Sequence, residues 1–151
     1  KGGVLVVGLD DLMTQIAHCC KPAPPDDIAG FVTRGKGISI HRTQCENFIH
    51  MKAQHPERVL ECTWSTMDGV RYEVDMVVTT QESVDMMRLI TDVLAREKVL
   101  VSGLRKQKKT QAAQDPVCDY IFSLEVENTA QLEKARSALM QIKGVSQVTR
   151  L

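Results

Sequence analysis

The sequence of 151 residues contains few aromatic residues, which make up 4% of it, and no apolar run long enough to span a bilayer. It also contains no signal-peptide pattern and no excess of charge, because 19 basic residues balance 19 acidic ones. No membrane role is indicated, and any contact with RNA must be local, since the basic footprint of a dedicated nucleic-acid binder is absent. Ordinary contents of hydrophobic (43%) and charged (25%) residues predict a soluble, cytoplasmic, globular protein.

The sequence also lacks the residue constellations of common catalytic sites. We find no nucleophile with a matching base and acid, no glycine-rich phosphate loop and no paired catalytic carboxylates. The chain starts at Lys1 without an initiator methionine, which suggests a piece of a longer protein. We therefore expect this chain to be non-catalytic and its function to depend on parts outside it.

Cysteine and histidine, in contrast, are concentrated in one stretch. The sequence His18-Cys19-Cys20 is followed by His41 and Cys45, which are four residues apart, as neighbours on a helical turn are. Zn²⁺ binds thiolate and imidazole ligands in tetrahedral geometry, and four protein ligands make a closed structural site rather than a catalytic one. This stretch is therefore the best guide to the function of the chain.

Two strand-like segments lie between the cysteine pair and the later ligands. Residues 28–33 and 37–41 are rich in β-branched side chains. Residues 34–37 between them contain two glycines, which permit a turn with positive φ. The pattern predicts a β-hairpin.

This hairpin predicts that the candidate ligands converge at one end. The proline-rich residues 21–27 bring Cys20 to the entry of the first strand, and His41 leaves the second strand at the same end. Cys45 follows at the start of a predicted short helix over residues 45–53, within reach of His41. The preferred ligand set is Cys19, Cys20, His41 and Cys45, with His18 as a substitute.

The same cysteines allow a plainer interpretation. Cysteine is often a small buried hydrophobic residue, and a directly adjacent pair is a less specific metal signal than the CxxC spacing of zinc ribbons. On spacing alone, metal binding and burial both stay open. A disulfide between neighbours would be strained, and five cysteines is an odd number, so a disulfide scaffold is the poorer account. Cys62 and Cys118 lie in strand-like patterns and are expected in the core.

Two small domains explain the pattern along the chain better than one. Residues 1–66 hold the cysteine cluster, the hairpin and a further strand near residues 58–64, and with few aromatics this domain has little material for a core. A metal ion would help it to fold. A Met67-Asp68-Gly69 turn then opens the second domain, residues 67–151.

The second domain alternates strand and helix patterns. Its first helix places five apolar side chains on one face: Met86, Leu89, Ile90, Val93 and Leu94. The predicted elements are strand 72–79, helix 84–97, strand 99–104, a polar loop to residue 116, a strand to residue 126, a helix that ends at Gly144, and strand 145–151. This β-α-β-β-α-β order predicts an α+β, ferredoxin-like sandwich with a four-stranded antiparallel sheet and both helices on one face.

The stretch CCKPAPPDDIAGFVTRGKGISIHRTQC, followed by this β-α-β-β-α-β pattern, resembles a known family over essentially all 151 residues. It is similar to the C-terminal regulatory end of the long RelA/SpoT-type (p)ppGpp synthetases, and more similar to RelA than to SpoT. The match follows the pattern CCxPxPGDxIxGFxTxGxGxxxHRxDC in one-letter code. The resemblance implies a zinc-finger-like domain followed by an ACT domain, also called RRM-like.

The resemblance also implies a function and partners. In this family the region engages the ribosome and uncharged tRNA and restrains or releases the N-terminal synthetase, so the implied parent is a GTP diphosphokinase of the stringent response. ACT domains commonly pair side by side, so we expect a homodimer through the strands at 99–104 and 145–151. The family's zinc ligands fall on Cys19, Cys20, His41 and Cys45. Three basic side chains are candidates for contacts with RNA phosphates, and they also fit an ordinary solvated turn: Arg34, Lys36 and Arg42.

Some positions depart from the family pattern. Pro25 stands where the family usually has glycine, and Gln44 stands where it usually has aspartate, so the carboxylate is missing there. The loop at residues 80–84 lacks the glycine that lets many ACT domains approach an amino acid closely. Two other functions stay open: an amino-acid-binding ACT module of a metabolic enzyme, and a zinc enzyme, which would need an open coordination position.

Overall fold

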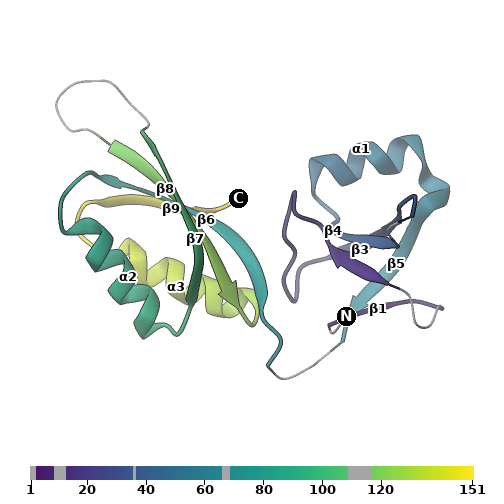
Figure 1. The fold of residues 1–151 in the computed structure, drawn as a ribbon, viewed down its shortest axis with the longest axis horizontal. Helices are drawn as coiled ribbons and strands as arrows, with labels where there is room; N and C mark the ends of the chain where they lie inside the picture. Colours follow the sequence, from purple (N-terminus) through teal and green to yellow (C-terminus); the bar gives the residue numbers. More distant parts are fainter. Residues whose placement is uncertain (1–2, 9–12, 36, 66–68, 109–116) are drawn as a thin grey trace. The chain divides into compact units, whose positions relative to one another are not determined.

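The computed structural model describes residues 3–8, 13–35, 37–65, 69–108 and 117–151 (Figure 1). The chain divides into two compact units, Lys1–Val70 and Arg71–Leu151, each with its own sheet. Helices and strands are mixed in both, which confirms the predicted α+β class. Met67 and Asp68 of the predicted turn lie outside the described residues. No helix within these ranges is long and apolar enough to cross a membrane.

The first unit is a five-stranded sheet with the strand order β1-β5-β3-β4-β2, accompanied by one α-helix (Figure 1). The predicted hairpin is present as β3 and β4, which pair antiparallel with Ile28 opposite Arg42 and Val32 opposite Ile38. The predicted helix follows β4 directly as α1. The elements are β1 Val4–Val6, β2 Thr14–Ile16, β3 Ile28–Val32, β4 Ile38–Arg42, α1 Glu46–Gln54, a 3-10 turn Pro56–Arg58 and β5 Val59–Trp64.

Two apolar clusters stabilise this sheet. One contains Val6, Ile38, Ile40 and Cys62. The other joins α1 to the sheet through Ala29, Phe31 and Phe48. Gly30 lies against the first cluster, where a Cβ atom would come within 2.7 Å of Cγ2 of Ile38 and 2.9 Å of Sγ of Cys62. The close packing at β3 therefore requires glycine.

The sequence did not reveal β1 and β2. β1 pairs antiparallel with β5, and β2 pairs parallel with β4 at the opposite edge of the sheet. Each has only three residues, too few for the period-two alternation of a strand to be recognised. β2 matters for the cysteine cluster, because the N–H of Ala17 continues its pairing by donating to the carbonyl of Ile40 at 2.9 Å. This bond holds the turn that carries Cys19 and Cys20 beside β4.

The second unit is the predicted ferredoxin-like sandwich. Its four strands pair antiparallel in the order β7-β8-β6-β9, and both helices cover the same face (Figure 1). Along β8 every second residue is buried, as expected for a sheet with one covered face. The elements are β6 Tyr72–Gln81, α2 Met86–Arg96, β7 Leu100–Lys108, β8 Val117–Val126, α3 Thr129–Met140 and β9 Val145–Arg150.

The length of β7 and the exposure of Leu89 differ from the sequence prediction, whereas the burial of two cysteines agrees with it. β7 runs on to Lys108 rather than ending at Leu104, because an edge strand can pair with β8 while the side chains of Arg105 and Lys106 stay exposed. Leu89 is 36% exposed, although the other four apolar residues of its predicted helix face are buried. Cys62 and Cys118 are both buried in the core, as expected.

Candidate metal centre

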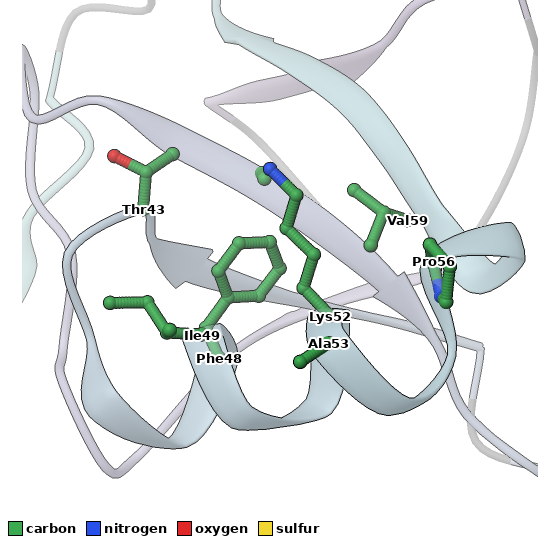
Figure 2. A pocket seen from close by; sticks show the side chains of 8 residues that line it. Thr43, Phe48, Ile49, Lys52, Ala53, Pro56 and Val59 are labelled. Atoms are coloured by element: carbon green, nitrogen blue, oxygen red, sulfur yellow. The ribbon is translucent and has the colours of Figure 1, made fainter.

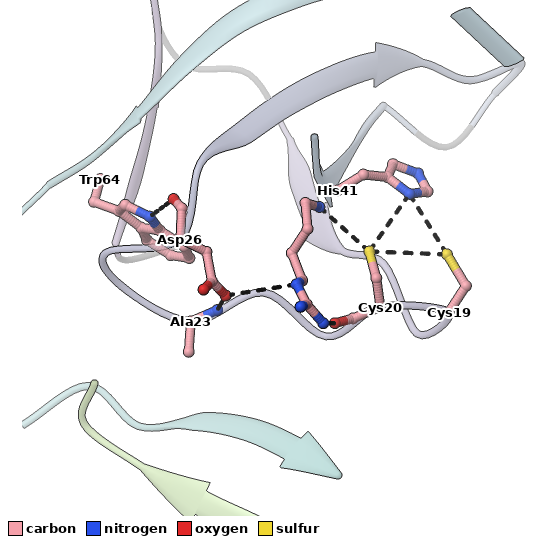
Figure 3. A network of polar contacts seen from close by, with 7 residues as sticks. Cys19, Cys20, Ala23, Asp26, His41 and Trp64 are labelled. Atoms are coloured by element: carbon pink, nitrogen blue, oxygen red, sulfur yellow. Dashed lines mark hydrogen bonds and ion pairs between the residues drawn. The ribbon is translucent and has the colours of Figure 1, made fainter. Parts of the chain in front are cut away.

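Four side chains from three segments meet at one end of the β3–β4 hairpin. Cys19 and Cys20 lie in the turn after β2, and His41 lies on β4 (Figure 3). Cys45 is the N-cap residue of α1. Their ligand atoms, the three Sγ atoms and one ring nitrogen, all lie within 4.8 Å of one another. The structure thus brings together the four residues that the spacing singled out.

Four of the six distances between ligand atoms are close to those of a tetrahedral metal site. Sγ of Cys19 lies 3.5 Å from Nδ1 of His41, 3.6 Å from Sγ of Cys45 and 4.0 Å from Sγ of Cys20. Sγ of Cys20 lies 3.8 Å from the same Nδ1. Zn–S bonds of about 2.3 Å and Zn–N bonds of about 2.0 Å at tetrahedral angles place ligand atoms about 3.5 to 3.8 Å apart. Donor types and spacing therefore both suit Zn²⁺.

The imidazole of His41 is oriented by its other nitrogen. Nε2 lies 2.9 Å from Oγ of Ser39, two residues earlier on β4, which leaves Nδ1 directed at the cysteines. The ring also stacks on Phe48 of α1, with centroids 5.7 Å apart. Burial lowers the pKa of His41, which favours the neutral imidazole that coordinates metals. Ser39 and Phe48 could not be predicted as part of the site, because neither is a ligand and neither has a distinctive spacing.

The thiols sit in different environments. Burial, opposed by a hydrogen bond from the N–H of Arg42 and assisted by the neighbouring thiols, raises the pKa of Cys20 to about 12. Burial also acts to raise the pKa of Cys45, but the backbone N–H groups of Phe48 and Asn47 and the neighbouring thiols outweigh it, so this pKa lies below its usual value. A cation among these sulfurs would favour the thiolate at each, since thiolate is the form that binds metal.

A polar network behind the cysteines holds the loop between β2 and β3 (Figure 3). The carboxylate of Asp26 accepts the N–H of Ala23 at 2.8 Å, and its backbone carbonyl accepts the indole N–H of Trp64 at 2.8 Å. The guanidinium of Arg42 lies 4.0 Å from that carboxylate and donates to the carbonyl of Cys20 at 3.3 Å. Arg42 therefore ties the cysteine turn to the proline-rich loop.

The other predicted site residues do not supply ligand atoms to the cluster as far as the structure describes them. His18 is exposed and does not belong to the group of metal-ligand side chains found among the described residues. Arg34 is exposed in the hairpin turn, whereas Lys36 lies outside the described residues. Arg42 is half-buried in the network of Asp26. Of the two predicted RNA-contact residues that the structure describes, Arg34 has an exposed side chain and Arg42 does not.

An apolar groove of about 580 Å³ lies beside the cluster, between α1 and the sheet (Figure 2). It is lined by Ala29, Thr43, Phe48, Ile49, Lys52, Ala53, Pro56 and Val59. Phe48 lines this groove and also stacks on His41, and it is the buried residue of α1. The position of α1 over the sheet therefore depends on the packing of Phe48 and on the contacts of Cys45 in the cluster.

The connection between β6 and α2 is where an amino-acid ligand would have to approach the backbone. The hydroxyl of Thr80 and the N–H of Gln81 both donate to the carbonyl of Gly144, at 3.0 and 2.9 Å. Gly144 has a φ of +102°, and a Cβ atom there would lie 2.8 Å from Cε of Met86. This glycine therefore serves packing at the end of α3, and residues 82–85 of the connection contain none.

Comparison with known proteins separates the same two halves. The family model of the RelA/SpoT RIS domain matches residues 4–65, and that of the ACT domain matches residues 68–150. GTP pyrophosphokinases of Haemophilus influenzae and Escherichia coli are 36% and 33% identical over 151 residues, covering 100% of this chain. The chain spans only 20% of the length of either relative. A crystal structure of the ACT domain from a GTP pyrophosphokinase of Chlorobium tepidum covers 54% of this chain and 100% of its own, at 20% identity and a TM-score of 0.45.

Proposed function

This chain belongs to the RelA/SpoT family, and we propose that it is the non-catalytic, C-terminal regulatory region of a GTP pyrophosphokinase that makes (p)ppGpp in the stringent response. In this proposal the parent enzyme senses ribosomes with uncharged tRNA, and the region controls the N-terminal catalytic domains. The proposal rests on family membership and on the geometry of the cysteine cluster. The amino-acid-binding alternative is less favoured, because the β6–α2 connection has no glycine to admit a ligand.

The observation that carries the structural part of the proposal is the four-ligand cluster. We propose that Cys19, Cys20, His41 and Cys45 bind one structural Zn²⁺ per chain. The ion would join the turn after β2, the end of β4 and the start of α1. Because all four positions are taken by protein, no site remains for a reactive water or a substrate. Such a closed site suits a rigid platform for recognition better than it suits a catalytic centre.

Metal analysis of protein purified without chelator tests the site. We expect about one zinc per wild-type chain, close to none in Cys45→Ser, and a full complement in Cys118→Ala, whose cysteine is buried far along the sequence in the second unit. Wild-type protein without zinc, or equal zinc in the Cys45→Ser variant, would refute the ligand assignment.

Recognition of RNA is proposed for the exposed end of the hairpin. Arg34 and Lys36 lie at its turn in the sequence, and Arg42 follows at its exit, where its contacts with Asp26 and Cys20 suggest a mainly supporting role. Phosphate contacts contribute affinity that decreases as salt increases, so charge reversal should weaken binding most at low ionic strength.

We also propose that the parent protein forms a homodimer through the ACT sheet. Its two edge strands, β7 and β9, are open to pairing with a second copy.

Synthesis of (p)ppGpp by the full-length protein, with and without ribosomes carrying uncharged tRNA, tests this function. We expect Arg34→Glu combined with Lys36→Glu to reduce ribosome-dependent stimulation while leaving basal synthesis unchanged. Lys134→Glu, a single reversal at an exposed position of α3, is the matched control and should behave as wild type. Unchanged stimulation in the hairpin variant would remove the hairpin from the RNA surface, and a loss of basal synthesis would show that the region supports catalysis directly.

A further inference from the structure

Two of the cluster thiols are placed to react with each other. Sγ of Cys19 lies 3.6 Å from Sγ of Cys45, closer than the 4.0 Å to Sγ of Cys20. Cys19 is exposed and Cys45 is partly exposed, whereas Cys20 is only 8% exposed. A small oxidant in solution therefore reaches the first pair more readily than it reaches Cys20.

A bond between these two cysteines requires a small movement of their sulfurs. A disulfide S–S bond is about 2.05 Å long, so the two sulfurs must approach by about 1.5 Å. Cys19 lies in a turn and Cys45 precedes the first turn of α1, so neither is held inside a regular element. Cys20 is the poorer partner, because a disulfide between adjacent residues is strained and its sulfur accepts the N–H of Arg42.

We propose that Cys19 and Cys45 form a reversible oxidation site, at which peroxide converts the two thiolates into a disulfide and the zinc ion leaves. This inference rests on the zinc site proposed above. Two ligands, Cys20 and His41, would remain, which is too few to retain the ion against water. The new disulfide would still connect the turn after β2 to the start of α1, so the oxidised domain keeps one covalent link in place of the metal.

The chemistry balances with hydrogen peroxide as the oxidant. One thiolate attacks a peroxide oxygen, which gives a sulfenic acid and releases hydroxide. The second thiolate attacks the sulfenic sulfur, the S–S bond forms and a second hydroxide leaves. Two thiolates thus lose two electrons, which reduce one peroxide to two hydroxide ions. A dithiol restores the two cysteines by exchange, after which zinc can bind again.

Peroxide titration of the zinc-loaded chain tests the proposal by two readouts that need no enzyme activity. A chromogenic chelator reports zinc release, and peptide mapping without reduction locates the new bond. We expect one zinc released for each intramolecular Cys19–Cys45 disulfide, and full recovery of zinc binding after treatment with dithiothreitol and added zinc. Cys62→Ala and Cys118→Ala, which remove the two buried cysteines outside the cluster, should release zinc at the wild-type peroxide dose.

The outcomes separate this inference from the zinc proposal. Untreated protein without zinc would refute the metal site, and mapping would still show whether Cys19 and Cys45 join. Zinc-loaded protein that keeps its metal after peroxide treatment would refute the oxidation site alone. Mapping that finds a Cys19–Cys20 bond, bonds between chains, or only sulfinic acid would also overturn it, because each outcome contradicts the pairing that the distances and exposures indicate.

Discussion

The two units of the chain bury their apolar side chains to different extents. In the second unit, Arg71–Leu151, here called the ACT unit, the large side chains of Met76, Ile90 and Leu139 are completely buried between the sheet and two helices. In the first unit, Lys1–Val70, here called the RIS unit, the short helix α1 packs on the sheet through one buried residue, Phe48. A small domain with so few buried side chains needs another source of stability, and the thiolate and imidazole cluster is placed to supply it.

The starts of two helices make the same contrast on a smaller scale. α3 begins at Asn128, whose side chain accepts the N–H of Gln131 at 2.8 Å, as a typical N-cap does. α1 begins at Cys45, whose sulfur lies 3.6 Å from Sγ of Cys19 in the cluster; the N–H groups of Asn47 and Phe48 lie close enough to lower its pKa, without a capping hydrogen bond like that of Asn128. In the proposed zinc-bound state the ion holds Cys45 in place as a thiolate at the start of α1, so one helix start depends on an ion where the other depends on a side-chain hydrogen bond.

Removal of the proposed zinc should give the largest effect and should strike one unit only. Structural zinc contributes about 10 kcal/mol or more of apparent binding free energy in zinc-finger peptides, enough to decide whether a small domain folds. We expect a strong chelator to unfold the RIS unit and leave the ACT unit folded. The lone tryptophan, Trp64, reports on the first unit, and both tyrosines, Tyr72 and Tyr120, report on the second. A Trp64 fluorescence spectrum unchanged by chelation would contradict the comparison.

A cavity in the ACT core should have the next largest effect, in the opposite unit. Leu124 is completely buried on β8, and Leu→Ala at such sites costs about 2 to 5 kcal/mol. We expect Leu124→Ala to lower the free energy of unfolding measured by the tyrosine signal without changing zinc content. Leu104→Ala on β7 is the control, because Leu104 is 46% exposed and should cost far less. Equal losses in the two variants would show that the sandwich core is not the main source of stability.

Loss of the hydrogen bond behind His41 should weaken the metal site without unfolding the domain at saturating zinc. Removal of an outer-shell partner typically lowers metal affinity about 10- to 100-fold. We expect Ser39→Ala to lower zinc affinity by a factor in that range, measured by competition against a chelator of known affinity. Ser102→Ala, the same substitution on β7, should leave zinc affinity unchanged. Wild-type affinity in the Ser39→Ala variant would mean that packing on Phe48 alone orients the ring.

The smallest effect is expected at the cap of α3. Asn→Ala at an N-cap costs about 1 kcal/mol, so Asn128→Ala should lower the denaturant midpoint of the tyrosine signal modestly. Trp64 fluorescence and zinc content should stay as in wild type. Asn47→Ala, at an exposed position in the first turn of α1, has no such role and should stay within about 0.5 kcal/mol of wild type. A larger loss for Asn47→Ala than for Asn128→Ala would contradict the contrast between the two helix starts.

Much of the fold could be predicted because long patterns carried it. The strand pattern over residues 72–79 and the apolar face of the first helix of the second unit indicated the sandwich, and the structure confirms it. The short strands β1 and β2 could not be predicted, since three residues do not define a period. Leu89 was expected in the core and lies at its margin, because periodicity gives a helix face but not how far the neighbouring strand covers it.

The sequence by itself determined the donor types of the candidate metal site, and hairpin and helix patterns predicted that four of them converge. That they bind zinc stays a prediction. Only the tertiary structure decided that His18 is exposed and outside the ligand group, that Ser39 and Phe48 contact the His41 ring, and that Arg42 is engaged with Asp26. The physical reason is that ligand identity and spacing are local properties of the chain. Exposure, ring orientation and the pairing of charges depend on contacts between segments far apart in the sequence.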